Sequence, residues 1–181
     1  DFGPFRDGGM QDSELGPIPV GWRTGALSET AEICSGKRPM EKSGEPSDVF
    51  SIPLIGASSI MGYVKAPPLY YEPIIVTGRV GTLGIIQQIY EPSWPSDNTL
   101  VCRTKWNDFI CQVLCRIDFS SLNRGSTQPL ITQSDLKKQN VVIPPDSILI
   151  AHANLSSPLS MQIQHNIETN KTLSAIRDTL L

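Results

Sequence analysis

The chain has 181 residues, of which 39% are hydrophobic and 18% are charged, and its formal net charge is −3 at pH 7. This length suffices for one domain with a buried core, and no apolar run reaches the roughly 18 residues that a membrane-spanning helix needs. No basic segment followed by an apolar one opens the sequence, so we expect no signal peptide, no membrane contact and a cytoplasmic protein. The sequence begins at Asp1 rather than Met, which suggests a piece of a longer protein.

The negative charge is concentrated near the N-terminus. Residues 1–14 contain four acidic side chains against Arg6 alone, whereas the rest of the chain carries 14 basic and 14 acidic residues. Turn-forming Gly8-Gly9 and Gly16-Pro17 interrupt the same region, so we expect an acidic flexible linker over residues 1–20. A nonspecific nucleic-acid binder usually has a basic excess. DNA binding by this chain would therefore require locally placed cations or a partner that supplies positive charge.

Residues 21–150 predict a β-rich domain. The 14 glycines and 15 prolines are scattered without a period, which favours turns and short strands over a helical bundle. Pro73 within one apolar run favours an edge strand or a bulge there. Short helices are expected over residues 108–116 and 134–139, the second because Thr132 and Asp135 form a capping pattern. We expect an α+β fold, with a twisted or partly closed sheet, whose strands lie over residues 49–57, 60–64, 69–76, 80–90, 99–103 and 141–143.

The C-terminal segment has a different pattern. It contains no Gly or Pro from residue 160 to residue 181, and about 22 residues in a helix would span roughly 33 Å. We expect a long amphipathic helix over residues 151–181 that serves as a subunit interface. An alternative is a helix folded back on its own domain. The interface residues recur every three or four positions and are Ile163, Ile167, Asn170, Leu173, Ile176 and Leu180.

The sequence shows no constellation of residues that would support catalysis. Ser35-Gly36-Lys37 resembles the end of a phosphate-binding loop, but the upstream glycine and the Ser or Thr after the lysine are missing. Residues 142–146 resemble the Pro-Pro loop of amino-methyltransferases only superficially, because Ile143 precedes the prolines. The acidic residues are dispersed, and the four cysteines form no C-x-x-C pair. We therefore expect reduced thiols, no metal site, no catalytic residue and no cofactor on this chain.

A glycine-rich segment is the best candidate for DNA contact. Thr77-Gly78-Arg79-Val80-Gly81-Thr82-Leu83-Gly84 places three glycines around one arginine, and glycines allow close backbone approach. Arginine is suited to reading guanine or gripping phosphate. The alternatives are a β-turn with Arg79 in solvent, or a brace in which Arg79 pairs with Glu72 or Asp97. We expect further contacts from polar loops, namely from Lys37, Arg38, Lys65, Arg124, Ser126 and Gln128.

Several segments in fixed order resemble a known family. The most specific is Ser13-Glu14-Leu15-Gly16-Pro17-Ile18-Pro19-Val20-Gly21-Trp22, and the whole resemblance spans residues 13–181. On these segments the chain resembles a target recognition domain, with its following long helix, of the specificity (S) subunit of type I restriction–modification systems. The other segments are 52–57, 60–63, 73–84, 94–100, 125–130, 143–145 and 166–181.

The resemblance implies a noncatalytic subunit that reads one half of a split double-stranded DNA target. In that family a whole S subunit carries two recognition domains, and their long helices pair antiparallel as a spacer. Modification (methyltransferase) subunits bind S-adenosylmethionine, and a restriction/translocase subunit uses ATP and Mg²⁺. One domain and one helix imply either half of a longer subunit or a half-subunit that forms a homodimer through the helix. The alternative is a protein-interaction module that docks through its helix without direct DNA contact.

Overall fold

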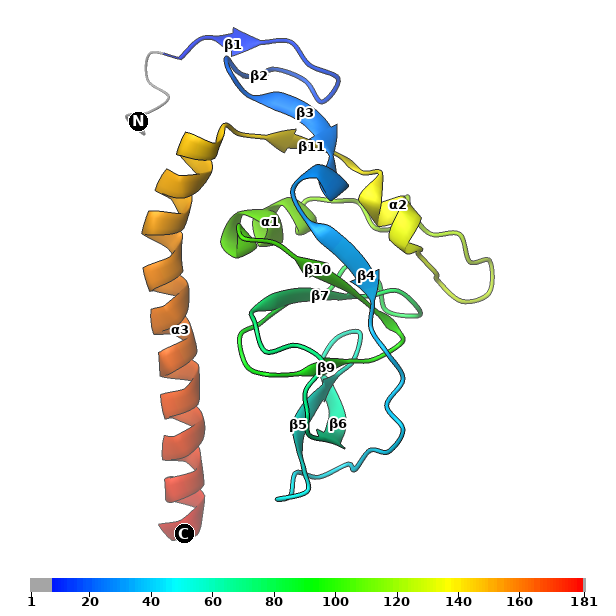
Figure 1. Ribbon diagram of the computed structural model, residues 1–181, viewed down its shortest axis with the longest axis vertical. Coiled ribbons are helices and arrows are strands. Elements are labelled where there is room, and N and C mark those ends of the chain that lie inside the picture. Colours follow the sequence, from blue (N-terminus) through cyan, green and yellow to red (C-terminus); the bar gives the residue numbers. More distant parts are fainter. Residues whose placement is uncertain (1–7, 181) are drawn as a thin grey trace.

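A four-stranded antiparallel sheet forms the centre of the molecule, in the order β4–β10–β7–β8. Residues 8–180 are described by the computed structural model, which places this sheet beside one long helix (Figure 1). Alternate residues of the strands point to opposite faces. Cys102, opposite both Ile33 and Ile75, faces one core, whereas Val101, opposite Val76, faces a second. The strands are β4 (Glu32–Ser35), β7 (Ile74–Gly78), β8 (Ile86–Ile89) and β10 (Thr99–Arg103).

Smaller sheets extend the central one. The second core joins the central sheet to a three-stranded sheet in which β5 pairs antiparallel with β6 and parallel with β9. Two further pairs, β3 with β11 and β1 with β2, lie towards the top in Figure 1. These strands are β1 (Met10–Gln11), β2 (Ile18–Pro19), β3 (Arg23–Ala26), β5 (Phe50–Ile55), β6 (Ile60–Lys65), β9 (Trp94–Pro95) and β11 (Asn140–Ile143).

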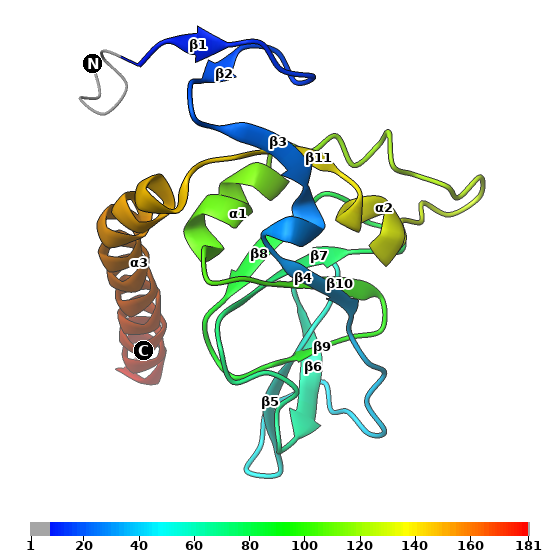
Figure 2. The same ribbon diagram turned by 45° about the horizontal axis from the view of Figure 1, so that its top comes forward.

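Three α-helices and one 3₁₀ turn complete the fold of residues 8–180. The 3₁₀ turn η2 (Leu27–Glu29) follows β3, and helices α1 (Asn107–Leu114) and α2 (Gln133–Lys137) cover the first core. Helix α2 begins where the sequence predicts, because Thr132 Oγ1 accepts a bond from Asp135 N and Asp135 caps Thr132 N in return. Figure 2 shows α1 between the central sheet and the long helix α3 (Asp146–Leu180). None of the described helices combines the length and apolar content that crossing a membrane requires.

The predicted α+β class with a long C-terminal helix is confirmed, and the sheets do not close into a barrel. Pro73 precedes β7 instead of interrupting it, and β7 is an interior strand, so the predicted edge strand or bulge at Pro73 is wrong. Helix α3 begins at Asp146, directly after Pro144-Pro145, and runs through Pro158. The expected boundary between residues 150 and 151 therefore falls inside the helix.

Part of the expected N-terminal linker is structured. Residues 10–19 form the β1–β2 hairpin, in which Ile18 is buried. Gln11 Nε2 donates to the carbonyl of Trp22 at 2.6 Å, and Asn140 Nδ2 on β11 donates to Glu14 at 2.9 Å. These bonds attach the hairpin to the domain. The first part of the expected linker, residues 1–7, lies outside the described residues.

Candidate DNA-binding face

The register of the central sheet gathers loops that are distant in sequence. Leu100 of β10 lies opposite Ser35 at the end of β4, and Thr99 lies opposite Gly78 at the end of β7. Because β10 runs antiparallel to both neighbours, the segments after Ser35 and Gly78 and the segment before Thr99 emerge at the same end of the sheet. Direct bonds hold them together, since Arg79 N donates to Asn98 O at 2.9 Å and Gly36 N donates to Thr99 O at 3.1 Å.

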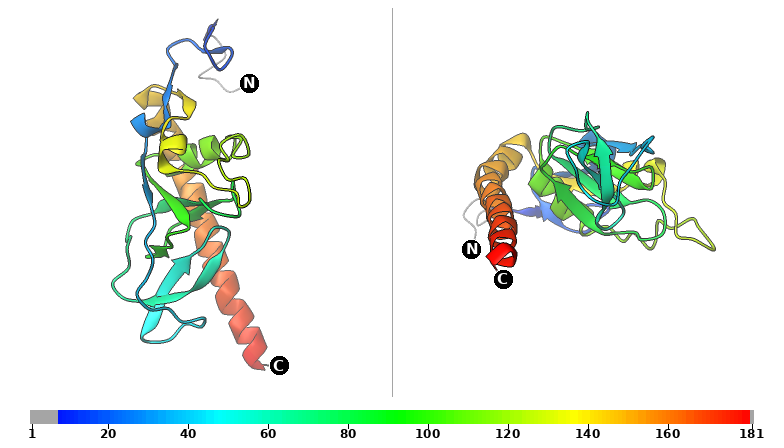
Figure 3. Two further views of the ribbon diagram at one scale, coloured as in Figure 1. Left: turned by 90° about the vertical axis from the view of Figure 1, so that its right-hand side faces the viewer. Right: turned by 90° about the horizontal axis from the view of Figure 1, so that it is seen from below.

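A later loop, residues 123–130, also bonds to the segment that follows β7. Gly81 N donates to Pro129 O and Ile131 N donates to Arg79 O, both at 2.9 Å. Within the loop, Asn123 Oδ1 accepts bonds from the backbone of Gly125 and Leu130. The loop projects on the side of the domain opposite α3 in Figure 1 and in the right-hand view of Figure 3. We define the loop face as residues 35–39, 78–84, 96–98 and 123–130.

Two glycines of the 78–84 segment are needed by the loop's own geometry. A Cβ at Gly78 would lie 2.0 Å from the carbonyl oxygen of Thr82, so no side chain fits there. Gly81 has a φ of 77°, in the left-handed region that other residues rarely adopt. A Cβ on Gly81 would lie 3.7 Å from Gln128 Nε2, which places Gln128 beside this turn. Gly78 and Gly81 are thus required by the conformation of the loop itself, independently of any close approach of the backbone to DNA.

Arg79 occupies the middle of the loop face. Its side chain is half-buried, and its Nη1 donates to Ser35 Oγ at 3.3 Å, while its Nε is buried without a partner among the described residues. The expected alternative partners are engaged elsewhere, since Glu72 pairs with Arg103 and Asp97 pairs with Arg38. Within residues 8–180, no carboxylate therefore neutralises the Arg79 guanidinium.

Three further cations lie on the loop face. Lys37 is exposed, and its backbone is fixed because Trp94 Nε1 donates to Lys37 O at 2.8 Å and Lys37 N donates to Pro95 O at 2.9 Å. Arg38 is exposed and pairs with Asp97 at 3.1 Å. The exposed side chain of Arg124 pairs with the buried Asp135. These pairs hold two of the arginines in place while leaving much of each guanidinium open to solvent.

The environment of Asp135 fixes its ionisation. Hydrogen bonds from Thr132, followed by those from Arg124, lower the pKa of the Asp135 carboxyl below its ordinary value, against the opposing effect of burial. Asp135 is 8% exposed and also caps α2. One carboxylate thus connects the start of α2 to the 123–130 loop. The side chain of Gln133, also in α2, donates to Ser35 Oγ at 2.9 Å.

The structure brings most of the predicted DNA-contact residues together, with one exception. Gly78, Arg79, Gly81, Arg38, Arg124, Ser126 and Gln128 lie on the loop face, with Ser126 and Gln128 exposed. The exception is Lys65, which lies opposite Phe50 at the start of β5. The loop face meets β5 at its other end, where Ser96 N donates to the carbonyl of Ile55, five residues away from Phe50. That separation corresponds to about 17 Å along a strand. Lys65 pairs with Glu41 at 2.5 Å instead.

Sequence reasoning missed the residues that hold the face in shape. Ser35 accepts side-chain bonds from both Arg79 and Gln133, and the Trp94–Asn98 segment supports Lys37 and Arg79. A tryptophan followed by Pro, Ser, Asp and Asn is a turn signal with polar side chains. This pattern identifies residues 94–98 as a loop. The contact of this loop with residues 78–84 could not be predicted, because it depends on the register between β10 and β7.

The predicted interface residues of α3 are all exposed in the chain alone. Ile163, Leu173, Ile176 and Leu180 are 57%, 57%, 51% and 80% exposed. Ile167, which is 41% exposed, borders a small hollow that α3 forms with residues 88–91. Helix α3 therefore lies along its own domain, as the folded-back alternative expects, while most of its apolar side chains stay open. The interface role of Ile163, Ile167, Asn170, Leu173, Ile176 and Leu180 remains a prediction.

Within the described residues, the cysteines form neither a disulfide nor part of a metal-ligating group. All four thiols are free, and no group of three metal-ligating side chains is found there. Burial raises the pKa of Cys102 and of Cys111 to about 12. A thiol with so high a pKa is a poor nucleophile at neutral pH.

Comparison with known families and structures identifies a consistent set of similar proteins. Residues 19–171 match the family described as the type I restriction modification DNA specificity domain. The fold is similar to the S subunit of a type I restriction–modification system from M. genitalium, with a TM-score of 0.59 and 14% identity, over 80% of this chain and 40% of that chain. It is also similar to the HsdS subunit from Thermoanaerobacter tengcongensis, with a TM-score of 0.52 and 14% identity, over 84% and 41%.

A third similar structure is described as showing complex assembly and conformational transition of the type I R-M system. Its TM-score is 0.55 and its identity 16%, over 88% of this chain and 44% of that chain. The chain thus spans between 40% and 44% of the length of these three chains. No curated protein matches the chain in sequence.

Proposed function

Since the chain belongs to the family of type I restriction-modification DNA specificity domains, we propose that it reads part of a double-stranded DNA target through the loop face. The observation that carries this proposal is the convergence of four loop segments around Arg79, whose charge no described carboxylate neutralises. A half-buried arginine that bonds to the Ser35 hydroxyl, and to no carboxylate of residues 8–180, keeps donors for an incoming acceptor. The neutral charge of the domain outside its N-terminus fits a reader whose affinity is shared with partner subunits.

The side chains of the loop face fall into two chemical groups. Arg79 and Gln128 are suited to base edges, because arginine can bond to guanine and glutamine to adenine in the major groove. Ser126 is suited to the same role, because a serine hydroxyl can bond to either of these bases. Lys37, Arg38 and Arg124 are exposed cations suited to phosphate oxygens. This division makes the first group responsible for sequence preference and the second for affinity and register.

We further propose that the chain is noncatalytic and directs partner subunits. Methyl transfer would belong to modification subunits that bind S-adenosylmethionine, and translocation and cleavage to a restriction subunit that uses ATP and Mg²⁺. Methylation and cleavage of the DNA would both take place in the cytoplasm. Purified chain incubated with S-adenosylmethionine, Mg²⁺ and DNA should neither methylate nor cut. An activity that follows the pure chain through successive chromatography steps would contradict this assignment.

A salt titration tests the DNA contact itself. The full chain, alone and together with its modification subunits, is titrated against duplex DNA between 50 and 200 mM salt, a range over which about six phosphate contacts would lower affinity by roughly 10³-fold. We expect a steep slope in the assembly. Intact subunit association without salt-dependent DNA binding by the chain would instead indicate a protein-interaction module.

A further inference from the structure

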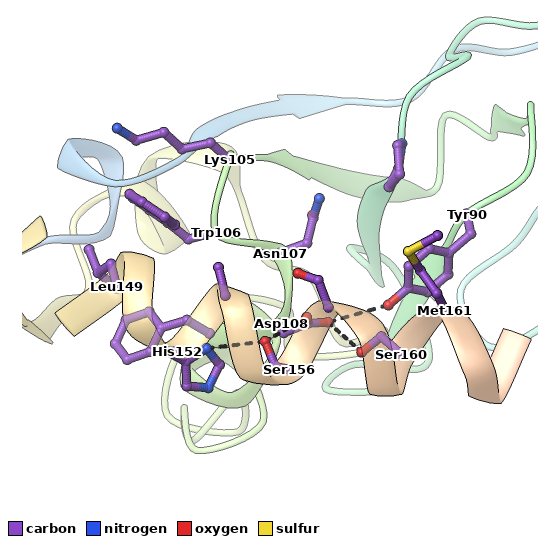
Figure 4. A pocket seen from close by; sticks show the side chains of 14 residues that line it. Tyr90, Lys105, Trp106, Asn107, Asp108, Leu149, His152, Ser156, Ser160 and Met161 are labelled. Carbon is purple, nitrogen blue, oxygen red and sulfur yellow. Dashed lines mark hydrogen bonds between the residues drawn. The ribbon is translucent and has the colours of Figure 1, made fainter. Parts of the chain in front are cut away.

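Helix α3 bonds and packs to the rest of the protein between Leu149 and Ser160, and further along it borders the hollow that it forms with residues 88–91. Leu149 is the one buried residue that this 35-residue helix contributes. His152 meets Phe109 of α1 edge to face, with ring centroids 5.8 Å apart. A cavity of about 360 Å³ is lined by residues of α1, α3 and the segment before α1 (Figure 4), so part of the surface between the two helices is unfilled. The direction of α3 therefore depends on few contacts.

Asp108 of α1 makes the most concentrated set of these contacts. The hydroxyls of Ser156 and Ser160 on α3 each donate to its carboxylate at 2.8 Å, one to each oxygen. From the central sheet, Gln88 Nε2 donates at 3.2 Å and Tyr90 OH at 3.3 Å. Figure 4 shows Ser156 and Ser160 on the same side of α3, pointing at this one carboxylate. Asp108 thus ties α1, the end of β8 and α3 together.

The geometry of these bonds restricts how α3 can move. Ser156 and Ser160 are four residues apart and therefore lie on one helix face. Bonds from both to a single planar carboxylate restrict rotation of the helix about its axis and sliding along it, and bonds to an ionised acceptor are stronger than neutral ones. Leu149 provides a second attachment, about 10 to 16 Å further back along the helix. The bonds to Asp108 and the burial of Leu149 together fix the direction of the α3 axis relative to the domain.

A neighbouring histidine extends the set. Ser156 gives its hydroxyl proton to Asp108, so Ser156 Oγ can only accept from His152 Nδ1, which lies 3.3 Å away. The bond orients Ser156 towards the carboxylate. The pKa of Asp108 is lowered despite its burial, because Ser156, Ser160, Gln88 and Tyr90 all donate to its charged form.

We propose that Asp108 is a positioning residue that fixes the direction of α3 relative to the recognition domain. Beyond Ser160 the helix continues for about 30 Å, so a tilt of about 10° at the junction displaces its end by about 5 Å. One base-pair step is about 3.4 Å. If the loop face reads DNA, as proposed above, the Asp108 junction determines how precisely a partner attached to the end of α3 is placed along the duplex.

The direction of α3 can be measured without reference to DNA. Spin labels are introduced as non-natural amino acids at the exposed positions Ser58, in the turn after β5, and Thr179, near the end of α3. We expect one narrow distance distribution in the unmodified full chain. The double variant Ser156→Ala/Ser160→Ala should broaden or shift it by about 5 Å, the displacement that a tilt of about 10° produces.

Matched variants separate positioning from general destabilisation. Exposed Ser157 and Ser174 make no bond to Asp108, so Ser157→Ala/Ser174→Ala should leave the distribution narrow. Ser156→Thr/Ser160→Thr retains both hydroxyls and should also keep it narrow. Asp108→Asn keeps the shape but not the charge, and should broaden it while the domain stays folded by circular dichroism. An unchanged narrow distribution in both the Ser156→Ala/Ser160→Ala and the Asp108→Asn variants would overturn the proposal.

A second readout tests the consequence for DNA. In the complex with modification subunits, methylation is measured on targets whose two half-sites are separated by spacers differing in single base pairs. Ser156→Ala/Ser160→Ala should lose the preference for one spacer while retaining affinity for a single half-site. If the unmodified complex shows no DNA preference at all, the proposed function fails, whereas the spin-label distances still decide the role of Asp108.

Discussion

Arg79 Nη1 donates a hydrogen bond to Ser35 Oγ, which joins the end of β7 to the end of β4 across the intervening strand β10. Ser35 accepts a second bond from Gln133 of α2. A single hydroxyl thus links three parts of the loop face. The arrangement holds the Arg79 side chain against the protein and, among residues 8–180, leaves the guanidinium without a carboxylate partner, as the proposed DNA contact requires.

Substitution of Arg79 should weaken DNA binding more than it weakens the fold. Arg79→Ala in the assembled complex should lower affinity by about 5- to 150-fold, corresponding to about 1–3 kcal/mol for a lost base contact. Arg79→Lys should restore only part of the affinity, because the lysine ammonium lacks the planar, rigid fork of the guanidinium. A panel of targets with single-base changes measures whether preference relaxes at one position. A lower melting temperature with unchanged affinity of the folded fraction would show that Arg79 only braces the loop.

Lys37 should act through phosphate. Its exposed ammonium sits on a backbone segment fixed by Trp94 and Pro95. Lys37→Ala should weaken binding to all sequences alike and reduce the slope of log affinity against log salt by about 1. Lys171→Ala removes the same charge from α3, away from the loop face, and should leave the slope unchanged. Equal effects of the two substitutions would mean that net charge, and not the loop face, determines affinity.

The elements with strong local patterns were predictable, and those made by tertiary contacts were not. Strand β10 has the bounds expected from its apolar run, and α2 starts at the predicted Thr132 cap. The β1–β2 hairpin has strands of only two residues, too short for any period. Helix α3 includes Pro158, as the predicted range of 151–181 does, but it begins five residues earlier than predicted, at Asp146, where Leu149 packs into the domain.

The candidate site was predictable in its residue types but not in its membership. The combination of Arg79 with glycines indicated the central loop. Lys65 was expected beside it on the basis of charge alone, and the register of β5 with β6 places it elsewhere. Ser35 stood out in the sequence only as part of an incomplete phosphate-binding pattern, and its place beside Arg79 follows from the pairing of β4 with β10. Which loops share one end of a sheet is decided by strand order, which no local pattern encodes.

Asp135 should make the stability of the 123–130 region depend on pH. Its folded-state pKa is lowered, so its contribution is fully present above its unfolded pKa of about 3.9 and is lost as pH falls through the folded value. The difference in unfolding free energy between the unmodified chain and Asp135→Asn should therefore be constant near neutral pH and shrink below about pH 4. Urea titrations across pH measure it, with the exposed Asp48→Asn as charge-matched control. A difference that persists unchanged at pH 2 would refute the role of the ionised carboxylate.

Thr132 tests the same cap from its other side. Thr132→Ala removes the hydroxyl that accepts from Asp135 N, and loss of such a cap costs about 0.5–2 kcal/mol. Thr132→Ser retains the hydroxyl and should recover most of the stability. Because α2 also carries Gln133, which bonds to Ser35, the alanine variant should loosen the loop face as well. Faster amide exchange at residues 78–84 would report that effect, and protection equal to that of the unmodified chain would contradict it.

The exposed apolar residues of α3 should mediate association with a second recognition half or a second copy of the chain. Leu173 and Leu180 are seven residues apart, lie on one side of the helix and are 57% and 80% exposed. Leu173→Asp/Leu180→Asp should reduce the mass measured by light scattering, or release the partner half, while the β-rich domain keeps its melting temperature. The control Thr172→Asp/Ala175→Asp adds the same charge about a third of a turn away and should leave association intact. A chain that is monomeric with and without these substitutions, and still binds its partner subunits, would show that α3 serves only its own domain.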